Sequence, residues 1–147
     1  MAAQNLNDPL ERVLADGIVF YQKLRHFHWS VTGPHFFALH GKFEELYDRW
    51  SDLIDDVAER VLQLGGRPVP TLAAALETAG ISEQSDVPDG RAMVRQVIAD
   101  LETQLAGFRK AIAAAEAAGD RSTANLLDGA GDETEKTLWM FRAWLAE

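Results

Sequence analysis

The chain has 147 residues, of which 47% are apolar and 25% charged, and its formal net charge is −9. This length and composition fit one globular domain with a single core, which we place over residues 1–147, and the absence of cysteine excludes disulfides, iron–sulfur clusters and cysteine nucleophiles. No apolar run approaches the roughly 18–20 residues that span a membrane, and no secretory signal precedes residue 12, so we expect a cytoplasmic protein.

The first part of the chain predicts two long helices joined by a tight turn. Over 9–32, apolar residues recur every three or four positions, and Asp8 followed by Pro9 is typical of a helix start. Gly33-Pro34 interrupts the pattern, and a second apolar stripe follows over 36–64. Because the linker is so short, we expect the two helices to form an antiparallel hairpin.

The second part predicts one short and two long helices. Gly65-Gly66 can end the second helix, and Thr71 caps a short helix that runs to about residue 78. A polar loop over 79–88 precedes a long helix that follows Asp89, and Gly119-Asp120 separates this helix from the last one. No segment alternates with a period of two. We therefore predict an all-α four-helix bundle with a short extra helix between its second and third long helices.

All four histidines, His26, His28, His35 and His40, lie in one window around the first interhelical turn. A bundle with an internal di-iron centre uses Glu-x-x-His pairs on two helices, and this chain contains no such pair. An internal centre of that kind is therefore disfavoured. His26 projects about 160° away from His28 around the helix, so we expect it to be structural, and His35 opens the second helix.

Titratable residues of the second helix share one of its faces. An α-helix turns by about 100° per residue. Measured around the helix axis from His40, Glu44 therefore lies at about 40°, Asp55 at about 60° and Glu59 at about 100°. Along the axis the histidine end of this face lies about 22 Å from the Asp55/Glu59 end, so one ion cannot reach both ends within a subunit. His28 stands at a similar height to His40 across the hairpin. Two such helices packed antiparallel about a twofold axis would form two equivalent sites with nitrogen and oxygen ligands, which suit Fe(II), Mn(II) or Zn(II).

Three runs of the sequence carry a family resemblance. The run H-F-H-W-S-V-T-G-P-H-F-F-A-L-H-G-K-F-E-E-L-Y-D, the run D-D-V-A-E-R-V-L-Q-L-G-G-R-P and the later T-L-W-M-F-R-A-W-L closely resemble the Dps family of mini-ferritins, over nearly the whole chain. The family pattern has five members, and each spacing is counted from the member before it. The pattern begins with a histidine, followed by a second histidine after twelve residues and an acid after four. An Asp then follows after eleven residues and a Glu after four more. Many members have Asp at the third position, where Glu44 is one methylene longer. The matching residues here are His28, His40, Glu44, Asp55 and Glu59.

The resemblance implies a ferritin-like fold and a homo-oligomeric shell, a dodecamer of 23 symmetry with ferroxidase sites at its twofold interfaces. It implies that the five matching residues bind the metal, and that Fe(II) is oxidised to Fe(III) with hydrogen peroxide as the preferred oxidant. The ferric product would be stored inside the shell, which protects against oxidative damage, and Zn(II) or Mn(II) could substitute for iron. Acidic pores near the start of the last helix admit iron in the family, and the nearest candidates here are Asp120, Asp128 and Asp132.

Two aromatic residues lie next to the matching ligands in the sequence. Trp29 follows His28, and Tyr47 lies one turn from Glu44. Our hypothesis is that Trp29 and Tyr47 give up an electron and so trap stray oxidising equivalents. The other tryptophans, Trp50, Trp139 and Trp144, are expected in the core or in subunit contacts.

Other interpretations of the same residues remain open at this point. A nucleoid protein that coats DNA neutralises phosphates with basic residues, whereas this chain is acidic and lacks a Lys-rich terminal extension, so direct DNA binding is disfavoured. A helical assembly protein without metal chemistry is a further alternative, against which the five filled ligand positions argue. The acids of the second helix could form a solvated face, and His28 and His40 could be hydrogen-bonded core residues.

Overall fold

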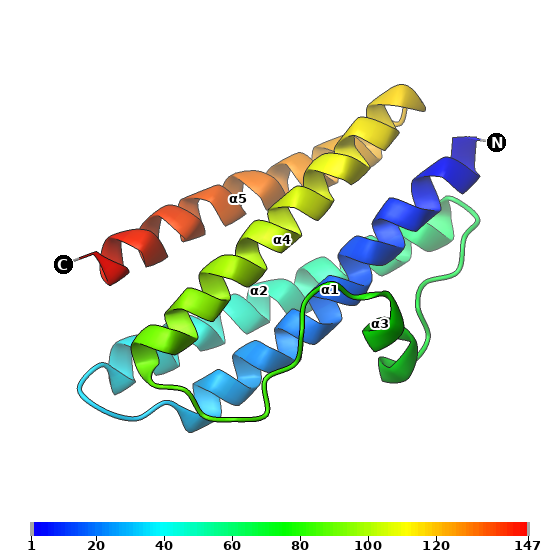
Figure 1. The fold of residues 1–147 in the computed structure, drawn as a ribbon. Helices are drawn as coiled ribbons and strands as arrows, with labels where there is room; N and C mark the ends of the chain where they lie inside the picture. Colours follow the sequence, from blue (N-terminus) through cyan, green and yellow to red (C-terminus); the bar gives the residue numbers. More distant parts are fainter. Residues whose placement is uncertain (1, 147) are drawn as a thin grey trace.

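The computed structural model describes residues 2–146, with side chains over 6–146. This part of the chain contains no strand, which confirms the predicted all-α class. None of its helices is both long and apolar enough to cross a membrane. The elements, shown in Figure 1, are α1 (Ala2–Ser30), α2 (Phe36–Gln63), α3 (Leu72–Thr78), α4 (Gly90–Ala117) and α5 (Arg121–Leu145).

The four long helices form a bundle in which each helix is antiparallel to its neighbours (Figure 1). Helices α1 and α2 make one hairpin, α4 and α5 make another, and α1 packs against α4. Arg49 of α2 joins the two hairpins by donating to the Thr137 hydroxyl of α5 at 2.7 Å. The connection from α2 to α4 returns along the outside of α1 and carries α3, which packs on α1. The predicted hairpin and the predicted extra helix are both confirmed.

Aromatic and aliphatic side chains fill the centre of the bundle. Phe20 of α1, Trp50 of α2 and Phe108 of α4 are fully buried. The rings of Phe20 and Trp50 meet edge to face with centroids 5.0 Å apart. The Trp50 indole N–H donates to the buried Gln104 side chain at 2.7 Å, so the polar atom of this large core residue is satisfied. Trp50 is predicted in the core or in a subunit contact, and it lies in the core.

The first helix begins earlier than the sequence predicts. It starts at Ala2, so the prediction of Asp8 as its N-cap is wrong, and Pro9 lies inside the helix. The reason is tertiary packing, because Leu6 is only 2% exposed and belongs to the core. Burial of Leu6 favours this earlier start, although proline cannot donate a backbone hydrogen bond inside the helix.

The later helix boundaries agree with the predictions. The Thr71 hydroxyl and the Asp89 carboxylate each accept a hydrogen bond from the backbone N–H three residues on, and so cap α3 and α4. Gly119, with φ of 72°, adopts the left-handed conformation after α4. Asp120 then caps α5 directly, which explains how the chain reverses between the two helices within so few residues.

Two buried charged side chains of α1 fix the long connection between α2 and α4. Asp16 is 1% exposed and accepts hydrogen bonds from the backbone N–H groups of Gly80, at 2.6 Å, and Ile81, at 3.0 Å. Lys23 donates to a backbone carbonyl of the same segment at 3.0 Å and pairs with Asp100 of α4 at 2.8 Å. Burial raises the pKa of Asp100, although the Lys23 ammonium opposes this shift. The connection is thus held on α1 along its length.

Candidate metal centre

His28 and His40 meet at the end of the bundle where α1 turns into α2. His28 lies in the last turn of α1 and His40 lies near the start of α2. Their rings stack with centroids 3.8 Å apart and planes 13° apart. His28 is 8% exposed and His40 is half-buried, with Phe36 stacked on His40 at 4.8 Å. The hairpin therefore brings the two predicted histidines together.

Each histidine ring is oriented by the backbone of the other residue. His28 Nδ1 lies 2.7 Å from the His40 carbonyl oxygen, and His40 Nδ1 lies 2.7 Å from the His28 carbonyl oxygen. Because a carbonyl oxygen can only accept, both Nδ1 atoms must carry a proton and donate it. In a neutral ring the Nε2 atom then keeps its lone pair, and metal-binding histidines are commonly oriented in this way. The pair therefore presents two Nε2 atoms able to bind a metal ion.

The predicted acidic ligands do not join the histidine pair within one subunit. Glu44 is exposed on α2, one turn beyond His40. Within residues 2–146, no three His, Asp or Glu side chains converge closely enough to hold a metal ion. One subunit thus offers the two histidines and the acids of α2 as separate groups.

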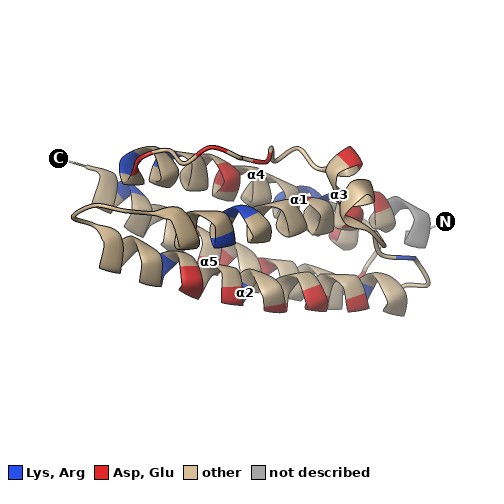
Figure 2. Ribbon diagram, turned by 90° about the horizontal axis from the view of Figure 1, so that it is seen from below, with Lys and Arg blue, Asp and Glu red and all other residues tan. Residues whose placement is uncertain are grey.

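Asp55 and Glu59 lie one turn apart farther along α2, where both are exposed. Figure 2 shows how Asp and Glu recur along this helix. In the part of the chain that the structure describes, neither Asp55 nor Glu59 has a hydrogen-bond or ion-pair partner. Asp52 and Asp56 are placed differently, because they line a groove between α2 and α5. Asp55 and Glu59 therefore remain available to a ligand or to another subunit.

The two predicted electron donors have different surroundings. The Tyr47 ring meets His28 edge to face with centroids 5.3 Å apart. Burial, together with nearby carboxylates, raises the pKa of the Tyr47 phenol, so the phenol stays protonated at neutral pH. Trp29 is 59% exposed, and the guanidinium of Arg25 lies 4.8 Å from its ring centroid. The structure thus brings Tyr47 against a predicted ligand, whereas Trp29 contacts Arg25.

Of the predicted pore residues, Asp120 has a clear structural role. Its carboxylate accepts the backbone N–H of Thr123 and pairs with Arg60 of α2 at 2.9 Å. Burial opposes ionisation, but the Thr123 hydrogen bonds and the Arg60 charge outweigh it and hold the pKa of Asp120 below its ordinary value. Asp120 and Asp128 border a pocket of about 570 Å³, and Asp132 is exposed one turn farther along α5.

Replacement of Asp120 by Asn is expected to lower the thermal unfolding midpoint at neutral pH but not in acid. The folded-state pKa lies below the unfolded value, so the ion pair stabilises above the unfolded pKa and stops doing so as the pH falls through the folded pKa. Asparagine can still cap α5. We expect the free energy of unfolding to fall by roughly 1–2 kcal/mol near neutral pH. Scanning calorimetry of both proteins, from neutral pH down through the acidic range, measures the difference. An equal loss at every pH would contradict this assignment.

Comparison with known sequences gives the family. A profile of the ferritin-like domain matches residues 7–147. The DNA protection during starvation protein of Brevibacillus brevis is 45% identical over 136 residues, which cover 92% of this chain and 91% of that protein. DNA protection during starvation protein 2 of Bacillus anthracis is 42% identical over 136 residues, or 92% of this chain and 93% of that protein.

Solved structures agree with the sequence relatives. The crystal structure of a Dps protein from Bacillus brevis has a TM-score of 0.95 at 43% identity, covering 99% of this chain and 97% of that chain. The Vibrio cholerae O1 Dps protein, described as a member of a broad superfamily of ferritin-like diiron-carboxylate proteins, has a TM-score of 0.96 at 36% identity. That match covers 99% of this chain and 91% of the other. With its four-helix bundle and its paired histidines, this chain therefore belongs to the ferritin-like proteins as a member of the Dps family.

Proposed function

We propose that this protein is a ferroxidase and iron-storage mini-ferritin that oxidises Fe(II), preferentially with hydrogen peroxide, at sites shared between two subunits. The observation that carries the proposal is the His28–His40 pair, whose Nδ1 atoms are both engaged by carbonyl oxygens so that both Nε2 atoms are free to bind. Asp55 and Glu59, the acids that remain available, lie farther along α2. Each subunit thus supplies two complementary parts of a site.

The donor set fits the proposed substrate ion. His28, His40 and Glu44 of one subunit would face Asp55 and Glu59 of the partner subunit when two α2 helices pack antiparallel about a twofold axis. Imidazole nitrogen together with carboxylate oxygen suits Fe(II), and also Zn(II) or Mn(II), which would compete for the site.

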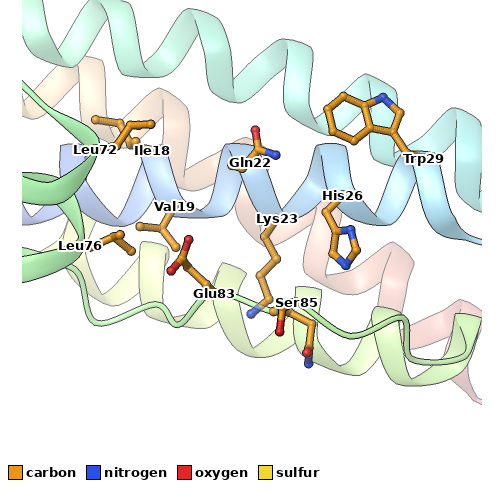
Figure 3. Close-up of a pocket in the computed structure, with 11 residues that line it drawn as sticks. Ile18, Val19, Gln22, Lys23, His26, Trp29, Leu72, Leu76, Glu83 and Ser85 are labelled. Atoms are coloured by element: carbon orange, nitrogen blue, oxygen red, sulfur yellow. The ribbon is translucent and has the colours of Figure 1, made fainter.

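Exposed apolar side chains support a subunit contact on the α1–α3 side of the bundle. Trp29, Leu72 and Leu76 are exposed and border a groove of about 440 Å³ between α1, α3 and the following connection (Figure 3). Leu72 and Leu76 lie at one end of this groove and Trp29 lies at the other (Figure 3). Exposed apolar side chains along a groove are a feature of protein contacts. We assign the contact to a second copy of this chain, as one of the interfaces of a dodecameric shell.

The proposed reaction consumes electrons in pairs. Two Fe(II) ions reduce one hydrogen peroxide to two waters, with two protons taken up, and two Fe(III) ions are formed. Because both electrons reach the same peroxide, this reaction releases no hydroxyl radical. The absence of this radical would account for protection against oxidative damage. The ferric product would be stored in the shell, with Asp120, Asp128 and Asp132 proposed near the route of iron entry. The net charge of −9 provides no basis for direct DNA binding.

Anaerobic titration of Fe(II) with hydrogen peroxide tests the proposal. We expect ferric absorbance to rise faster than in a protein-free solution, with about one peroxide consumed for two Fe(II), and the product to remain soluble and to co-elute with the oligomer. Oxygen in place of peroxide should give a slower reaction. Oxidation at the protein-free rate with both oxidants would overturn the proposal.

A further inference from the structure

We infer that Tyr21 is a second redox residue, which takes oxidising equivalents from Tyr47 beside the His28–His40 pair. The inference rests on the proposed function, because that function supplies the Fe(II) and the hydrogen peroxide. The chain has only two tyrosines, and these two are in contact with each other.

A series of ring contacts leads away from the histidine pair. Tyr47 meets His28 with centroids 5.3 Å apart, and it meets Tyr21 with centroids 6.0 Å apart at an angle of 88°. Tyr21 precedes His28 by seven residues on α1, and Tyr47 follows His40 by seven residues on α2. The tyrosines are thus paired across the hairpin two turns beyond the histidines. Because electron transfer weakens steeply with distance, these contacts favour a stepwise transfer from Tyr47 to Tyr21.

Arg25 makes Tyr21 a better acceptor of the oxidising equivalent than Trp29. The Arg25 guanidinium lies 5.4 Å from the Tyr21 ring centroid and 4.8 Å from the Trp29 ring centroid. An oxidised indole carries a positive charge until it loses a proton, so the neighbouring cation disfavours its formation. A tyrosine loses its phenolic proton together with the electron and becomes a neutral radical, which avoids this repulsion.

Each step balances. When a peroxide meets a single Fe(II) instead of two, it takes one electron and one proton and gives water, Fe(III) and a hydroxyl radical. This radical takes a hydrogen atom from the Tyr47 phenol, which gives water and a neutral Tyr47 radical. That radical takes an electron from Tyr21 and a proton from solvent, while Tyr21 releases its own proton to solvent. A further Fe(II) then reduces the Tyr21 radical, with uptake of a proton, and becomes Fe(III). The net reaction converts a hydroxyl radical, one Fe(II) and one proton into water and Fe(III).

Freeze-quench electron paramagnetic resonance of the assembled protein, loaded with Fe(II) and mixed with excess hydrogen peroxide, tests the inference. The samples are the wild type, Tyr21→Phe, Tyr47→Phe and the double variant, all of which keep the aromatic rings. Since the chain has only two tyrosines, each single variant leaves one source of tyrosyl radical. We expect Tyr47→Phe to lose most of the radical. Tyr21→Phe should keep a radical on Tyr47 that differs in line shape from the wild-type radical and decays more slowly. This variant should also release more spin-trapped hydroxyl radical than the wild type.

Two outcomes would overturn the relay. One is a Tyr21→Phe spectrum that matches the wild type in line shape and decay. The other is an undiminished radical yield in Tyr47→Phe, which would mean that Tyr21 is not oxidised through Tyr47. The same transfer is expected in the iron-free shell after one-electron oxidation by a photogenerated ruthenium(III) complex. That measurement separates failure of the relay from failure of the proposed function, because it needs no iron chemistry.

Discussion

Simultaneous replacement of His28 and His40 by alanine is expected to reduce peroxide-dependent Fe(II) oxidation to the protein-free rate. The change removes both Nε2 donors and leaves the acids of α2 in place. Loss of a group that merely orients a metal ligand costs about 10–100-fold in affinity or activity, so loss of the two proposed ligands should cost more than about 100-fold. Ferric absorbance after anaerobic addition of peroxide measures the effect.

His26→Ala is the matched control for this double variant. The His26 Nε2 atom lies 2.8 Å from the Asp86 carbonyl oxygen, so His26 binds the connection between α3 and α4 rather than the histidine pair. We expect this variant to oxidise Fe(II) as the wild type does. Size-exclusion chromatography of both variants establishes that the oligomer is intact. An intact double variant that still oxidises Fe(II) rapidly would remove His28 and His40 from the site.

Mixing two inactive variants is expected to restore activity if the site is shared between subunits. One parent carries His28→Ala and His40→Ala, and the other carries Asp55→Asn and Glu59→Gln. In a mixed twofold pair, one site receives both defects and the other receives none. Random reassembly makes about half of the pairs mixed, so about a quarter of all sites, and of wild-type activity, should return.

This mixing experiment distinguishes a shared site from a site inside one subunit. Each parent alone, taken through the same dissociation and reassembly, provides the baseline. If one subunit supplied every ligand, the mixture would be as inactive as its parents. Reassembled wild-type protein gives the activity to which the recovered fraction is compared.

The bundle could be predicted from the sequence because its signals are local. Apolar spacing, the break at Gly33-Pro34 and the caps at Thr71 and Asp89 each act within a few residues. The start of α1 could not be predicted, since a local rule places proline in the first turn, whereas the burial of Leu6 depends on the rest of the bundle. Tertiary packing decided that boundary.

The candidate site could be predicted to a similar degree. Counting outward from the first turn places His28 and His40 at one height, and the structure agrees. The exchange of Nδ1 hydrogen bonds could not be predicted, because it depends on side-chain torsions and on the distance between the helices. The Tyr21–Tyr47 contact follows the same counting rule, but the spacing of Tyr21 among the apolar residues of α1 predicts only that it faces the bundle.

The reciprocal hydrogen bonds from ring to carbonyl make the positions of the two histidine rings depend on the spacing between α1 and α2. Each ring is fixed by the opposite helix, so a change in that spacing would displace both Nε2 atoms together. Phe27 and Phe43, fully buried with centroids 6.0 Å apart, help to set the spacing directly beside the pair. Metal affinity at the proposed centre should therefore vary with the volume of these two core side chains. Evolution could in this way tune the proposed centre from the hydrophobic interior while every proposed ligand stays unchanged.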